Sequence, residues 1–189
     1  MSWLEIASVL FSLVFLVLLI RQNIWCWLFG IISSVLSAYL FYTINLYSEC
    51  ILYTLYAVFG VYGWLVWARS DTATFDNTKE GSAIKPIKGM RLLQFIGLGI
   101  PFSILAGYLS QSLLKDAAIP YIDATTSVFG LIATYLEAHR YLSAWVFWIV
   151  LNLATAIIYF NRGLMIYGPL MLVYFVFSIV GYRRWSQST

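Results

Sequence analysis

Charged, sulfur-containing and imidazole side chains are all scarce in this sequence. Only 10% of the 189 residues are charged, two are cysteine and one is histidine. The single imidazole, His139, and the lack of Ser/His or paired-Asp spacing argue against the usual catalytic constellations. Cys26 and Cys50 lack metal-ligand spacing, which indicates small packing residues. We therefore expect no enzyme activity, no catalytic residue, no metal and no cofactor.

Long apolar runs dominate what is present. Hydrophobic residues make up 62% of the chain, and the mean hydropathy is +0.85. This composition predicts an all-α integral membrane protein in contact with lipid. A spanning helix needs about 20 apolar residues, and seven such runs are predicted, at 4–20, 24–43, 46–67, 92–114, 120–138, 142–161 and 164–182. The net charge of +3 is too small to suggest a nucleic-acid partner.

Basic residues give the predicted orientation. The polar segment 68–91 has no apolar period and is predicted to be a mobile linker between two halves. With the N-terminus outside, only Lys115 and Arg162 of the 11 basic residues lie outside. The positive-inside rule therefore predicts a multi-pass protein with an external N-terminus and a cytoplasmic C-terminus.

The two halves of the chain are related in sequence. An offset of 118 residues aligns 27–67 with 145–185 without a gap and pairs identical residues, such as Trp27 with Trp145 and Tyr56 with Tyr174. Such an offset predicts parallel three-helix repeats joined by one extra helix, a 3+1+3 transporter architecture with its substrate near the midplane. The predicted units are a first repeat at 1–68, a linker at 69–91, a connecting helix and outer loop at 92–119, and a second repeat at 120–189.

One stripe of the run 142–161 carries unusual residues for an apolar helix. Trp145, Trp148 and Asn152 share a helical face, and a buried amide without a partner costs about 1 to 3 kcal/mol or more. Indole faces attract flat cations, so the stripe predicts a site for a small, positively charged aromatic metabolite. Two alternatives stay open: Asn152 bonds a neighbouring helix, and Trp145 belongs to an interfacial aromatic belt.

The predicted site also includes Ser34, and it is lopsided, because the first half has Ser34 where Asn152 stands and Gly30 where Trp148 stands. Further candidate contacts come from the tyrosines of the third helix of each repeat, for which a packed ring is the alternative. These candidates are Tyr53, Tyr56 and Tyr174.

Acidic residues in the apolar runs also need an explanation. Asp123 is a candidate site residue, although a carboxylate near a helix N-terminus is equally a favourable cap. Glu137 is expected near the inner surface as a solvated or paired end, and Glu49 is expected at the outer end of its helix. Because no carboxylate pair lies in mid-helix as in many proton-coupled carriers, facilitated diffusion is expected.

Several motifs resemble the Pnu family of bacterial vitamin transporters, best known for nicotinamide riboside uptake. They are "FGIISS", "YGWLVW", "PYIDA" at 120–124, W-x-x-W-x-x-x-N from Trp145 to Asn152, and the closing "GYRRW". The resemblance implies an inner-membrane carrier with the 3+1+3 fold of SWEET sugar transporters, facilitated diffusion, trapping of the vitamin by a cytosolic kinase, and trimers as a possible assembly. It assigns substrate binding to Trp145, Trp148 and Asn152.

Two departures from the nicotinamide riboside pattern shift the expected substrate. Tyr53 stands where those members usually have Gln, and Ser143-Ala144 stand where they tend to have Glu-Asn. The expected substrate is therefore a cationic B-vitamin with thiamine slightly favoured, and nicotinamide riboside is the alternative. A structural or assembly subunit, in which the aromatic residues only pack, is the remaining alternative class.

Overall fold

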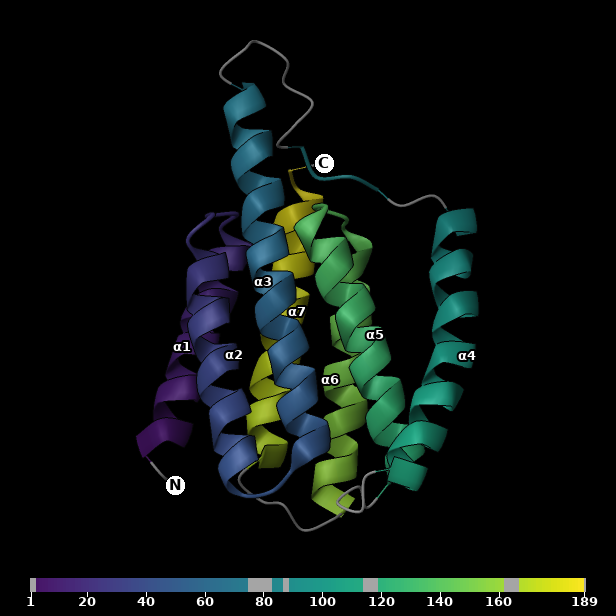
Figure 1. The fold of residues 1–189 in the computed structure, drawn as a ribbon. Coiled ribbons are helices and arrows are strands. Elements are labelled where there is room, and N and C mark those ends of the chain that lie inside the picture. The colour runs from purple at the N-terminus through teal and green to yellow at the C-terminus, as the bar shows by residue number, and fades with distance from the viewer. Residues whose placement is uncertain (1–2, 75–82, 87–88, 114–118, 162–166, 189) are drawn as a thin grey trace.

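The structure is a computed structural model, and it describes residues 3–74, 83–86, 89–113, 119–161 and 167–188. The described residues form a bundle of helices, α1 to α7 (Figure 1). Their bounds are α1 Trp3–Ile20, α2 Cys26–Thr43, α3 Tyr47–Thr74, α4 Gly89–Leu113, α5 Pro120–Ala138, α6 Ser143–Asn161 and α7 Tyr167–Ser186. Each of the seven predicted apolar runs is therefore a helix.

Five helices are long and apolar enough to cross a membrane: α1, α2, α3, α4 and α6. The other two, α5 and α7, run alongside them through the same bundle (Figure 1). Their lower hydropathy has a visible cause, because α5 carries Asp123 and Glu137 and α7 ends with Arg183 and Arg184. The chain is thus a helical, multi-pass membrane protein.

Contacts divide the bundle into two groups of three helices. Helix α2 packs against both α1 and α3, and α6 packs against both α5 and α7. The groups meet where α3 packs against α5 and where α7 packs against α1. Helix α4 lies at the edge of the bundle beside α5 (Figure 1). It approaches α5 closely through Gly99, where an added Cβ would lie 2.7 Å from the Phe129 ring.

The segment predicted as a linker is partly ordered by the bundle. Helix α3 continues to Thr74, seven residues into it, because residues 68–74 contain no proline or glycine to end the helix. Further along, Ile84 is buried in the core, and the Lys85 backbone pairs with the turn after α5, donating to the Arg140 carbonyl at 2.9 Å and accepting from Leu142 at 3.1 Å. The residues 75–82 and 87–88 of this segment lie outside the described part of the chain.

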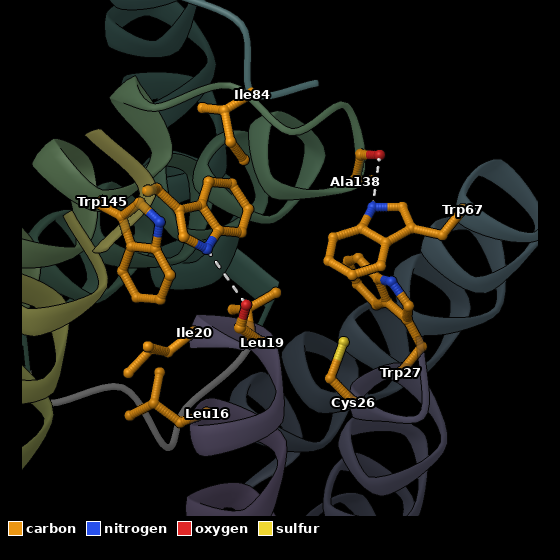
Figure 2. Close-up of a cluster of buried hydrophobic side chains, with 10 residues drawn as sticks. Leu16, Leu19, Ile20, Cys26, Trp27, Trp67, Ile84, Ala138 and Trp145 are labelled. Carbon is orange, nitrogen blue, oxygen red and sulfur yellow. Dashed lines mark hydrogen bonds between the residues drawn. The ribbon is translucent and has the colours of Figure 1, made fainter. Parts of the chain in front are cut away.

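The densest core lies at one end of the bundle, which we call the basic end because Arg21, Lys85, Arg140 and Arg183 follow or end the elements there. Its centre is two pairs of indole rings, Trp27 against Trp67 and Trp145 against Trp185, each edge to face, with centroids 5.6 and 5.4 Å apart (Figure 2).

Each indole pair also links one group of helices to the other. The Trp67 indole N–H donates to the Ala138 carbonyl at the end of α5, at 3.0 Å. The Trp185 indole N–H donates to the Leu19 carbonyl at the end of α1, at 3.3 Å (Figure 2). The two exchanged bonds hold the groups together at the basic end.

Candidate functional site

Trp145 is part of the core at the basic end. Its ring is fully buried between Trp185 and the backbone of Gly181, where an added Cβ would lie 2.6 Å from ring atom Cε3. This burial rules out the interfacial-belt alternative, because a belt residue faces the lipid headgroups. Trp27 stands in the same relation to Gly63 and Trp67. The observed contacts of Trp145 are therefore packing contacts, and its role as a ligand contact stays a prediction.

Trp148 lies one turn along α6 and is only half-buried. Its indole N–H, the only donor of that side chain, forms a hydrogen bond with the carboxylate of Glu137 on α5. A Cβ added at Gly130 would lie 3.7 Å from its ring atom Cη2 and directly against the Tyr56 hydroxyl. Because Gly130 on α5 has no side chain, the Trp148 ring from α6 and the Tyr56 phenol from α3 can both approach it.

Glu137 contradicts the expectation of a solvated or paired helix end. Its side chain is 2% exposed, and Oε2 has no hydrogen-bond partner in the described part of the chain. The sequence position near Arg140 was misleading, because the segment around Ile84 and the end of α3 cover this end of α5. Side chains on a helix lean toward its N-terminus, so the carboxylate lies back from the helix end, toward Trp148.

A polar stripe on α5 was the signal that could have found Glu137. Its members recur at helical spacing and comprise Asp123, Ser127, Gly130, Thr134 and Glu137. In the structure the last three are buried and the first two are half-buried, so the stripe faces protein. Interior polar stripes in membrane helices are a recognised mark of a functional path.

Asn152 has the partner that its depth in α6 requires. Its amide Nδ2 donates to the Ser178 hydroxyl on α7 at 3.1 Å, and that hydroxyl donates in turn to the Tyr174 carbonyl at 2.8 Å. The interhelical bond raised as an alternative is thus present. Asn152 nonetheless remains half-buried, with accessible surface beside this bond.

The three candidate tyrosines lie around the junction of the two groups of helices. The Tyr174 hydroxyl on α7 is hydrogen-bonded to the Ser12 hydroxyl on α1. Tyr53 stacks on Phe41, with centroids 5.3 Å apart, and its edge meets Tyr56 at 5.8 Å. Tyr174 also lies within electrostatic range of Tyr53. The phenols of Tyr56 and Tyr174 point toward the opposite group of helices, yet both residues keep accessible surface.

The structure thus brings together most of the predicted residues, but not all of them. Trp148, Tyr56 and Tyr53 gather where α3, α5 and α6 meet, and Asn152 and Tyr174 gather where α6, α7 and α1 meet. Asp123 lies in the first turn of α5, at the end opposite the basic end, where a carboxylate favourably meets the helix N-terminus. Ser34 is half-buried on α2, and Trp145 lies deeper in the basic-end core.

His139 stands just outside this cluster, as the residue that ends α5. Its Nε2 is hydrogen-bonded to the Tyr62 hydroxyl at 2.9 Å, and its ring lies 4.6 Å from that of Tyr135. Partial burial and, to a smaller extent, the nearby Lys85 ammonium lower the pKa of His139 below its usual range. This shift favours the neutral imidazole in the folded chain.

Comparisons with known proteins give the family and the fold of the chain. The model of a family described as nicotinamide mononucleotide transporter matches residues 2–187. Nicotinamide riboside transporter PnuC of Neisseria mucosa is 29% identical over 196 residues, which cover 98% of this chain and 73% of that protein. The protein of the same name from Escherichia coli is 22% identical over 214 residues, covering 100% of this chain and 87% of that one.

The crystal structure of the Vitamin B3 transporter PnuC has the same fold. It matches with a TM-score of 0.76 at 24% sequence identity, covering 98% of this chain and 81% of that chain.

Proposed function

Because the chain belongs to the nicotinamide mononucleotide transporter family, we propose that it carries nicotinamide riboside across a bacterial inner membrane. The family is one of membrane transporters, and the two similar proteins from Neisseria mucosa and Escherichia coli are both named for nicotinamide riboside. The observation that carries the proposal is the approach of Tyr56 and Trp148 over Gly130, together with the hydrogen bond between the Trp148 indole and the buried Glu137 carboxylate. An aromatic face beside a buried carboxylate is suited to a flat cation.

Thiamine is the less favoured substrate, which corrects the preference drawn from the sequence. The positions that suggested thiamine are engaged in packing within the chain. Ser143 and Ala144 are 8% and 0% exposed at the start of α6, and the Tyr53 ring stacks on Phe41 while keeping some accessible surface. These positions therefore say little about the polar edge of the substrate.

We assign substrate contact to Trp148, Asn152, Tyr56, Tyr53 and Tyr174, which keep accessible surface near the junction of the two groups of helices. Trp145, which is fully buried in the basic-end core, stays a predicted substrate contact. Ser34 and Asp123, both half-buried, are assigned to the path toward the site.

The architecture that we propose is the parallel 3+1+3 repeat of the SWEET type, with α4 as the connecting helix and units 1–68, 69–91, 92–119 and 120–189. Equivalent contacts at the offset of 118 residues support it. Trp27 on Gly63 corresponds to Trp145 on Gly181, and Tyr56 at Gly130 corresponds to Tyr174 at Ser12. Each of these contacts in one group thus has a counterpart in the other.

Transport is proposed to be facilitated diffusion. The basic end is proposed to be cytoplasmic, as the positive-inside rule predicts. A cytosolic kinase is proposed to complete uptake by trapping the vitamin. The prediction rested on the absence of paired carboxylates in mid-helix, and Glu137 is a single buried carboxylate. Uptake that is unchanged by a proton ionophore would support this mechanism, whereas loss of uptake would show proton coupling.

Titration calorimetry of the purified chain in detergent tests the proposed substrate. We expect saturable binding of nicotinamide riboside and weaker binding of thiamine. The reverse order would return thiamine to first place. Binding of neither compound would favour a protein whose aromatic residues only pack.

A further inference from the structure

Glu137 is a buried acidic residue that helix packing does not explain. One carboxylate oxygen accepts from Trp148, and Oε2 has no hydrogen-bond partner in the described part of the chain. A carboxylate at 2% exposure inside a membrane bundle is costly unless it is paired. Such a residue in a transporter family indicates a functional role.

The groups around Glu137 come from four other elements. Trp148 on α6 is hydrogen-bonded to it, and Tyr56 on α3 and Cys26 on α2 lie within electrostatic range of it. The nearby cation is Arg140, in the turn after α5, whose guanidinium lies over the Trp67 ring at 4.3 Å from its centroid. The Trp148 indole and the Glu137 carboxylate are thus joined by a hydrogen bond, while the guanidinium is held over a different indole.

We propose that Glu137 is the counter-charge that makes this site select positively charged aromatic rings over neutral ones. The inference rests on the proposed function and adds a residue to its binding site. The cationic ring lies against the indole of Trp148, and the carboxylate that this indole orients stabilises the positive charge. The substrate class is therefore a pyridinium or similar cationic ring, recognised by its charge as well as by its shape.

The relation between the two halves gives independent support. At the offset of 118 residues, Leu19 occupies the position of Glu137 and Gly30 the position of Trp148. Leu19 is fully buried in the apolar core of the basic end. Because the carboxylate and the indole occur together in one half and are both missing from the other, they form a functional pair, which a need for helix packing alone would not require.

The test compares two ligands that differ in charge. Nicotinamide riboside is a cation, and its 1,4-dihydro form is neutral but keeps the sugar and the carboxamide. Calorimetry on the full chain gives both affinities for the wild type and for Glu137→Gln, which keeps the size of the side chain and removes its charge. We expect Glu137→Gln to bind the cation about 10- to 100-fold more weakly and the neutral form as the wild type does.

Glu5→Gln is the matched control. It removes a carboxylate from α1, whose oxygen accepts from Tyr167 at the opposite end of the bundle, and an amide oxygen still accepts there. We expect unchanged affinities for both ligands. Trp148→Phe is the second variant for the case that Glu137→Gln does not fold, since it keeps an aromatic ring but removes the indole N–H that orients the carboxylate. It should lower the ratio of cation to neutral affinity.

The outcomes separate the counter-charge role from the transport function on which it rests. If Glu137→Gln keeps the wild-type ratio of cation affinity to neutral-ligand affinity, the counter-charge role is overturned and the proposed function still stands. If only Trp148→Phe folds, the same result in that variant has the same meaning. Failure of the wild type to bind nicotinamide riboside would overturn the proposed function itself.

Discussion

Adding one methyl group at Gly181 should destabilise the bundle by about 1–3 kcal/mol, the usual cost of overpacking. A Cβ there would lie 2.6 Å from Cε3 of Trp145. Carbon atoms in ordinary contact are about 3.5–4.0 Å apart, so the ring would have to retreat by about 1 Å. It has little room to do so, because Trp145 is fully buried and its other side meets Trp185.

The equivalent change in the first half, at Gly63, tests the same kind of contact independently. A Cβ at Gly63 would lie 2.5 Å from Cζ2 of Trp27, which is 1% exposed and packed on Trp67. Gly63→Ala and Gly181→Ala should therefore have similar costs. Gly97→Ala is the control, since nothing lies within 4 Å of its added Cβ and alanine favours a helix over glycine by about 0.5–1 kcal/mol.

Thermal unfolding in detergent, followed by intrinsic fluorescence, measures these differences. For a chain of this size each kcal/mol shifts Tm by about 2–4 °C, so both alanine variants should melt about 2–12 °C below the wild type. Gly97→Ala should melt at or slightly above it. If Gly181→Ala melted like Gly97→Ala, the reasoning that the two indoles are locked against glycine backbone would be refuted.

Three further predictions test other parts of the chain. Asn152→Ala should weaken nicotinamide riboside binding at least about tenfold in calorimetry, since a buried polar contact is worth about 1–3 kcal/mol. Trp27→Ala should lower Tm and cause a smaller loss of affinity. Equal losses of affinity in the two variants would argue against a lopsided site. Ile84→Ala, which truncates a side chain 4% exposed, should cost about 2–5 kcal/mol of stability. Lys85→Ala should cost little, because Lys85 pairs through its backbone. Equal Tm values for the two variants would contradict the burial of Ile84 in the core. The pKa of His139 is lowered in the folded chain, so the unfolded chain binds more protons and wild-type stability should fall as pH drops below about 6.5. His139→Gln should reduce this fall in stability. An unchanged pH profile of stability in this variant would show that His139 does not contribute.

The helices were predictable because each is a largely apolar run of about 20 residues, and their bounds differ from the prediction by only a few residues in most cases. Helices α5 and α7 illustrate the limit of hydropathy alone, since both fall short of the composition of a spanning helix. The offset of 118 residues still indicated them, because it relates them to α1 and α3. Sequence similarity between the halves therefore supported the two predicted helices whose composition is least apolar.

The candidate site was less predictable, because burial depends on which helix covers which end. Trp145 and Trp148 share a helical face, yet one is closed in by Gly181 and Trp185 and the other meets a carboxylate. Glu137 was expected near the surface and is buried, and the segment around Ile84, which pairs with the turn after its helix, belongs to a stretch with no apolar period. Such coverage arises from tertiary contacts between residues far apart in sequence, which local pattern cannot reveal.

The most direct test of the proposed function is flux through the purified chain in proteoliposomes. Labelled nicotinamide riboside should enter saturably, faster than thiamine, without an ion gradient, and Asn152→Ala or Glu137→Gln should slow its entry. Nicotinamide riboside flux no greater than that of protein-free liposomes, with the chain folded and correctly inserted, would contradict the account.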